Sequence, residues 1–397
     1  MYSLRRSCRA ALLDSNHVLV LANGSRRAFS RSAVHFRGAL PVYLEASSPE
    51  LSQLLSSVNS KVLLLRHLTP EQEKLVYKPA NRSKLEQEPV EITLGDVTLT
   101  LQHIDVNKDV PSYRKQLLKI LRTSKTPEDW ENVVRVLEGY NNAGIRLRSD
   151  TLSMAVRRLD EAGMQHLILK AIQRAEATGL RLRDPDLIFM VMRSVRDRAW
   201  RNDWDKDELK KALRMAEQIV ELMDDPVHQG KPSADGPDYR THPAVVALPL
   251  EMAAELAYRH DGPSDTVKKY TPRFMNALKQ HDFMTTEITE LDSLAAQTSS
   301  DFRTRYAQAS ALPNIQNKAA ALVPVWNALS VSRTVLDAEM PMADDAARVQ
   351  RQLRDVLGKA VDALERLKVR DGEELASGVE TGFAGYLNRA IRACEEE

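Results

Sequence analysis

Apolar residues recur along the middle of the chain at helical spacing, and their register returns after 35 residues. The segment Gly144-Ile145-Arg146-Leu147-Arg148 reappears as Gly179-Leu180-Arg181-Leu182-Arg183. The first helix of each unit keeps the same offset at two sets of apolar positions: Leu117, Leu152 and Leu187, and Leu121, Val156 and Val191. A fixed period of this length is typical of stacked helix-turn-helix units, which bury their apolar stripes against one another. The pattern therefore predicts a solenoid of paired helices from Pro111 to Met223.

The ends and the irregularities of these helices can also be predicted. Gly144 and Gly179 follow the second helices of two units, where glycine adopts a left-handed cap at least cost. The second helix of the third unit, Asp207 to Met223, arrives late because Arg201-Asn202-Asp203-Trp204 precede it. We expect an insertion there.

Before the repeats, the pattern changes from helix to strand. Apolar residues between Leu51 and Leu65 predict a short amphipathic helix that breaks near Asn59-Ser60. Residues 90–101 alternate between apolar and polar on both sides of Gly95-Asp96, which predicts a β-hairpin with a type II′ turn. Because two strands alone are marginally stable, this hairpin should lean on neighbouring helices or on a partner.

After the repeats, a loop precedes more helices. Residues 226–243 contain four prolines and two glycines without apolar periodicity, which indicates a linker. Helical patterns resume over 244–260 and 264–281, and a stripe over 344–369 predicts a helix packed within its own domain. We therefore expect a mainly α protein with these parts: 1–29 transit peptide, 30–110 α+β segment, 111–225 helical repeats, 226–243 linker, 244–397 helical domain.

The N-terminal composition indicates the subcellular location of the protein. Residues 1–44 contain seven arginines, one aspartate and no lysine, a composition typical of a mitochondrial transit peptide. Arg27-Ala28-Phe29-Ser30 resembles the cleavage site of the mitochondrial processing peptidase, which implies a cut between Phe29 and Ser30. A disordered basic tail is the alternative. Since no later run of 18 apolar residues exists, we expect no membrane span and a location in the mitochondrial matrix.

At Ala162-Gly163 the chain resembles a known family. A second helix that follows Ala-Gly and closes with Gly-Leu-Arg-Leu-Arg, at period 35, is similar to the pentatricopeptide repeat of organellar RNA-binding proteins. The resemblance covers about residues 111–225 and implies a helical binding surface. Leu147 and Leu182 stand where the family has proline. The base-reading positions align with Ser153, Arg183 and Ile188, which argues against sequence-specific RNA recognition.

The sequence carries no recognisable catalytic motif. Gly230-Lys231-Pro232-Ser233 lacks the spacing of a phosphate-binding loop, and the nine histidines form no metal-binding pair. Cys8 and Cys394 are the two cysteines, and Cys8 falls in the predicted presequence, so we expect no disulfide. We predict no enzyme activity, cofactor, metal or small-molecule substrate.

The candidate binding residues are arginines. Residues 141–200 hold eleven Lys or Arg and seven Asp or Glu, and the guanidinium group suits phosphates. The predicted partner-binding set is Arg146, Arg148, Arg157, Arg158, Arg181, Arg183 and Arg193, and we expect Arg196 and Arg198 to extend it. The alternative is a solvated face paired with Asp150, Asp160, Asp184 and Asp186. If RNA binds, the contacts should be to its backbone.

Three functions fit these features. The favoured one is a structural component of the mitochondrial ribosome that docks on ribosomal RNA or ribosomal proteins, because the chain resembles peripheral subunits of the fungal-type mitochondrial ribosome. The alternatives are a pentatricopeptide-type RNA-maturation or translation factor and an assembly factor for a respiratory complex.

Overall fold

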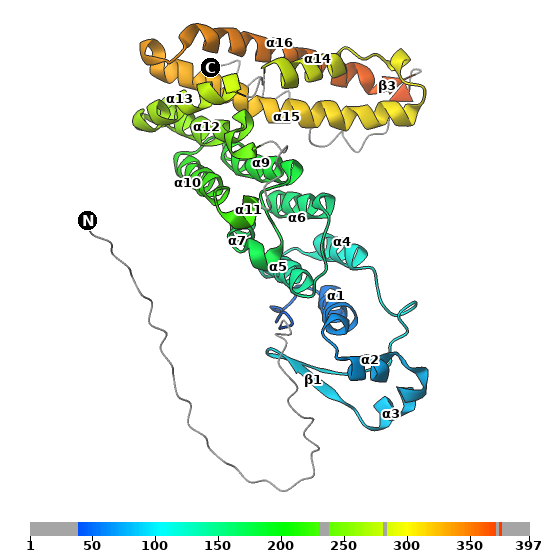
Figure 1. Cartoon of the computed structure of the whole chain (residues 1–397). Coiled ribbons are helices and arrows are strands. Elements are labelled where there is room, and N and C mark those ends of the chain that lie inside the picture. The colour runs from blue at the N-terminus through cyan, green and yellow to red at the C-terminus, as the bar shows by residue number, and fades with distance from the viewer. Residues whose placement is uncertain (1–38, 230–237, 281–283, 371–372, 375–397) are drawn as a thin grey trace, which may run out of the picture. The chain divides into compact units, whose positions relative to one another are not determined.

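The regular structure is almost entirely helical, as predicted. The computed structural model describes residues 39–229, 238–280, 284–370 and 373–374 (Figure 1). The predicted presequence, with its cleavage site at Phe29 and Ser30, lies outside these residues. So does the end of the chain from residue 375.

The first helix, α1 (Pro49–Val58), begins at Ser48, whose side chain accepts a hydrogen bond from the Leu51 backbone N–H. It changes into a π-helical turn, η1 (Asn59–Leu63), at the predicted break. Asn59 is buried there and donates from Nδ2 to the Pro41 carbonyl oxygen at 3.0 Å. A polar side chain that bonds to a distant backbone therefore marks the break. Short helices follow: η2 (Leu64–Arg66), α2 (Pro70–Tyr77), η3 (Pro79–Asn81) and α3 (Arg82–Gln87).

The predicted hairpin is present. Strand β1 (Glu91–Leu94) pairs antiparallel with β2 (Val97–Thr100), and Leu94 lies opposite Val97. Gly95 has φ +67° and Asp96 does not have a positive φ, which fits the type II′ turn. Ile92 and Leu94 are buried in the same core as the helices around them, so the hairpin packs against helices of its own chain.

Three helix pairs follow where the 35-residue period predicted them. The first helices of successive pairs contact one another, and so do the second helices, as in a solenoid. Leu117, Leu152 and Leu187 are all buried in one core. The pairs are α4 (Tyr113–Thr123) with α5 (Pro127–Asn142), α6 (Ser149–Glu161) with α7 (Gln165–Gln173) and α8 (Ala175–Thr178), and α9 (Pro185–Arg201) with α10 (Lys206–Leu222). The resemblance to the pentatricopeptide repeat stays a prediction.

The predicted insertion in the third pair has a structural role. Asp203 and Trp204 adopt left-handed backbone angles, with φ of +49° and +57°. This turn carries the Trp204 ring into the interior, where it is 5% exposed, and the Trp204 carbonyl oxygen lies 2.7 Å from His260 Nε2. The extra residues therefore join the repeat helices to the helix that ends at His260.

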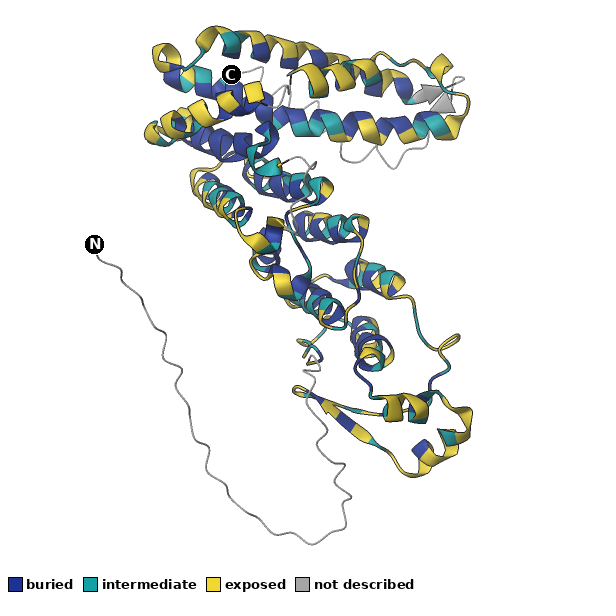
Figure 2. Cartoon of the chain, in the orientation of Figure 1, coloured by how far each residue is buried: buried dark blue, intermediate teal, exposed yellow. Residues whose placement is uncertain are grey.

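That helix, α12 (Pro243–His260), lies between two hydrophobic cores. Val245 and Leu248 belong to the core of the repeats, whereas Val246 and Leu250 belong to the core of the C-terminal helices. Most of α12 is dark blue in Figure 2, because every residue from Pro243 to Leu256 is buried. Two short elements precede it, α11 (Pro226–Gln229) and η4 (Tyr239–Thr241). The domain division at 226–243 stays a prediction.

The C-terminal helices pack around a long central helix, α15 (Arg305–Leu336). It is long and apolar enough to span a membrane, but 61% of its most apolar window is buried inside the protein. The predicted stripe of the last helix faces inward, since Leu353, Ala360 and Leu367 are buried. The remaining elements are α13 (Asp265–Gln280), η5 (Met284–Ile288), α14 (Thr289–Ala295), η6 (Ser299–Asp301), η7 (Asp337–Glu339), α16 (Ala343–Leu367), β3 (Val369–Arg370) and β4 (Glu373–Glu374).

Candidate macromolecule-docking surface

Four of the predicted arginines lie in the loops between successive helix pairs. Arg146 and Arg148 follow Gly144, which ends the α5 segment with φ +71°; Arg181 and Arg183 follow Gly179 in the same way. The apolar residues between the arginines are buried or half-buried, so the backbone alternates inward and outward. The 35-residue repeat thus places these arginines at corresponding points of two loops.

The two loops nevertheless differ in environment. Arg146 and Arg183 are exposed and form no ion pair with any described residue. Arg148 donates to Asp150 at 2.6 Å, and this bond holds the pKa of Asp150 down to about 2. Arg181 is half-buried near His228, whose Nδ1 accepts from the Leu182 backbone N–H at 3.0 Å. Burial lowers the pKa of His228, and the charge of Arg181 acts in the same direction.

The predicted arginines on the helices all have carboxylate partners. Arg157 and Arg158 both pair with Glu161, at 3.8 and 2.8 Å. Arg193 pairs with Asp197 at 3.2 Å. The exposed pairs with Glu161 contribute about 0–1 kcal/mol each, so an incoming ligand can displace them at small cost. Asp197 is 1% exposed, so displacing Arg193 would leave a buried carboxylate without this partner. All of these ion pairs reduce the positive potential that the arginines present to a polyanion.

Arg196 does not belong to a surface patch, contrary to the sequence-based expectation. It is 1% exposed, and its Nε donates to Glu251 at 2.8 Å. Asn327 donates from Nδ2 to Glu251 at 2.9 Å and to Glu255 at 2.7 Å, which joins α9, α12 and α15. Arg196 also lies over the Trp204 ring, 5.6 Å from its centroid. Its charge is used inside the protein because α12 packs over this face of α9.

The prediction overlooked a group of cations on α4. Four cations here are exposed and form no side-chain ion pair with any described residue: Lys115, Lys119 and Arg122 on this helix, and Lys125 just after it. A fourth helical cation, Arg114, pairs with Asp150 at 3.0 Å. Residues 113–126 contain no Asp or Glu. That absence of acids is the signal that could have identified the group from sequence.

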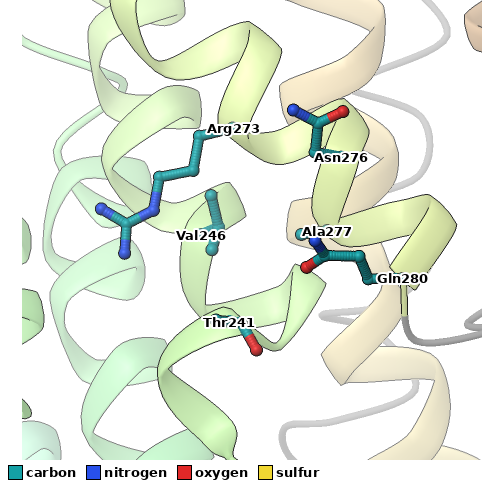
Figure 3. A pocket seen from close by; sticks show the side chains of 6 residues that line it. All are labelled: Thr241, Val246, Arg273, Asn276, Ala277 and Gln280. Carbon is teal, nitrogen blue, oxygen red and sulfur yellow. The ribbon is translucent and has the colours of Figure 1, made fainter.

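Cavities add little chemistry to the docking surface. A pocket of about 370 Å³ lies where α13 approaches the start of α12 (Figure 3). Its lining has one charged side chain, Arg273, beside residues such as Asn276 and Val246. A second cavity of about 310 Å³ lies between α6, α9, α12 and α15, and its lining includes Ser153 and Arg193. No cluster of His, Cys, Asp or Glu that could hold a metal ion occurs in the part of the chain that the structure describes.

Comparison with known proteins gives the family. The small ribosomal subunit protein mS27 of Neurospora crassa is 27% identical to the chain over 236 residues. This alignment covers 57% of the chain and spans 60% of the length of that relative. The family described as mitochondrial ribosomal protein mS27 matches residues 27–381, which is most of the chain. The protein that folds into these stacked helices therefore belongs to the mS27 family of mitochondrial ribosomal proteins.

Proposed function

We propose that the chain is a structural component of the small subunit of the mitochondrial ribosome and supports translation in the mitochondrial matrix. The observation that carries the proposal is the family match over residues 27–381. The Neurospora crassa relative is a protein of the small ribosomal subunit, which supports the choice of subunit.

The fold supports a docking role for the repeats. Stacked helix pairs present a continuous row of helix faces and loops, which suits contact with a large partner. The partner in this proposal is ribosomal RNA, ribosomal protein or both. The loop arginines Arg146 and Arg183 are exposed and unpaired among the described residues, so they are part of the proposed contact surface. Arg148, Arg157, Arg158, Arg181 and Arg193 remain in the proposed set as secondary contacts.

Sedimentation of a mitochondrial lysate tests this function. In a sucrose gradient at moderate salt with magnesium present, the chain should migrate with ribosomal particles. Treatment of the lysate with ribonuclease before the gradient is the matched control and should move the chain toward the top. Migration with free protein in the untreated lysate would contradict the proposal.

A further inference from the structure

Helix α4 carries the most one-sided group of unpaired charges described above. Its cations recur as Lys115, Lys119 and Arg122, four and three residues apart, and Lys125 follows just beyond the end of the helix. At 3.6 residues per turn, the three helical cations fall within an arc of about 60° and span about 10 Å along the axis. They form one row.

Packing fixes the direction in which this row points. Leu117, Ile120 and Leu121 lie on the opposite face of α4 and are 3% exposed or less. That face packs against α1 and α5. Because the apolar face is held in the core, the helix cannot rotate to bring its cations toward carboxylates of the chain. The row must face outward.

The chemistry of the row favours a phosphate backbone over a protein partner. Cores of protein–protein interfaces are depleted in charged residues and enriched in large apolar and aromatic ones. The outward face of α4 offers three cations, and the half-buried Leu118 and Thr123 border their row on either side. Evenly spaced cations without acids match a polyanion with regularly spaced charges, because each cation that neutralises a phosphate releases condensed counterions.

We propose that Lys115, Lys119 and Arg122, with Lys125, bind the phosphate backbone of ribosomal RNA without reading its sequence. The identity of the RNA as ribosomal rests on the proposed function; the preference for phosphate rests on the α4 face itself. The contact lies on the first helix of the first pair, whose Arg114 shares Asp150 with the loop residue Arg148.

Binding of the full-length chain to in vitro transcribed small-subunit mitochondrial ribosomal RNA tests the proposal. The test variant is Lys115→Gln, Lys119→Gln, Arg122→Gln. The matched control is Lys206→Gln, Lys210→Gln, Arg214→Gln, which removes three exposed cations from one face of α10, a helix that also carries acids. Circular dichroism and a thermal melt should show that both variants fold as the wild type does.

The dissociation constant is measured over a salt series. For the α4 variant, the slope of log affinity against log salt should fall in magnitude by about 2 to 3, since each lost phosphate contact removes about 0.7–0.9. For the control variant, the magnitude of the same slope should fall by less than about 1. An α4 variant with the wild-type slope, or a control that loses as much as the α4 variant, would overturn the proposal.

The gradient separates this proposal from the proposed function. If the wild type sediments with ribosomal particles while the α4 variant keeps the wild-type salt slope, the α4 inference is wrong and the function stands. If the α4 variant binds RNA normally but leaves the particle, α4 contacts a protein and the inference is again wrong. If the wild type stays with free protein while the α4 variant loses its slope, the function is wrong and the phosphate site stands.

Discussion

At the scale of single residues, the buried network around Arg196 joins the repeat helices to the helices that follow. Glu251 Oε1 accepts from both Arg196 and Asn327, and Arg259 binds Glu255 at 2.7 Å. Each buried charge would be costly alone, so the members depend on one another. The network therefore favours one arrangement of α9, α12 and α15 over others that a purely apolar contact would permit.

Removing one member of this network should destabilise the protein strongly. At pH 8, where Glu251 is ionised, Arg196→Met leaves this buried carboxylate without its charged partner and should lower the free energy of unfolding by about 3–5 kcal/mol. Urea denaturation followed by circular dichroism would measure the change. Arg157→Met, which breaks an exposed pair with Glu161, is the control and should cost less than about 1 kcal/mol. Equal small losses for both variants would show that the Arg196 network does not stabilise the fold.

The same network should make stability depend on pH. Burial raises the pKa of Glu251 from 4.5 to about 7, against the opposing effect of Arg196. The folded state then holds a proton that the unfolded state releases, so this contribution is complete below pH 4.5 and lost as pH rises through 7. Between pH 5 and 8, the free energy of unfolding of the wild type should fall by about 2–3 kcal/mol more than that of Glu251→Gln, whose side chain at this position does not titrate. Parallel urea midpoints over this range would contradict the protonation of Glu251.

At the scale of elements, a close contact fixes the hairpin turn. A Cβ added at Gly95 would lie 2.5 Å from the Ala39 Cβ, in addition to the strain of φ +67°. Gly144 has a similar φ of +71°, but a Cβ there would meet nothing within 4 Å. Substitutions at these two glycines can therefore distinguish the cost of backbone strain from the cost of steric crowding.

Alanine substitutions should show this difference. Gly144→Ala should lower the free energy of unfolding by about 1–2 kcal/mol, because a residue with a side chain is strained in the left-handed backbone conformation. Gly95→Ala should cost more, because Ala39 or the turn must move as well. Hydrogen exchange at the Leu94 and Leu99 amides would show whether the loss lies in the hairpin. Equal losses for both variants would mean that the contact with Ala39 is easily relieved.

Local patterns predicted most elements, because helix and hairpin signals lie within a few residues. The offset of Leu117, Leu152 and Leu187 predicted the helix pairs, and Gly95-Asp96 predicted the turn. The role of Arg196 could not be predicted from local patterns, because it depends on residues far away in the sequence. Glu251 lies 55 residues from Arg196, and Asn327 lies 76 residues from Glu251. The arginine set is different, because Glu161 lies only four and three residues from Arg157 and Arg158, and these two pairs could have been identified from local sequence.

At the scale of the whole molecule, the chain combines a repeat surface with a C-terminal group of helices joined to it through α12. The formal net charge of the full sequence is only +1, so attraction to RNA must come from local faces such as α4. This distribution suits a subunit that docks in one orientation on a large partner. A polycation would bind nucleic acid without preference.

Depletion of the chain should impair translation as a whole. Pulse labelling should show that all mitochondrially encoded proteins fall together, because a ribosomal subunit serves every message. Mitochondrial transcript levels are the control and should stay near normal. Loss of a single transcript would favour an RNA-maturation factor, and loss of one respiratory complex with normal labelling would favour an assembly factor.

The most direct measurement is sedimentation after the two ribosomal subunits are separated by lowering magnesium. The chain should leave the intact ribosome peak and appear with the small-subunit ribosomal RNA. Its appearance with the large subunit would contradict the choice of subunit, and its appearance with free protein under both magnesium conditions would contradict the ribosomal function itself.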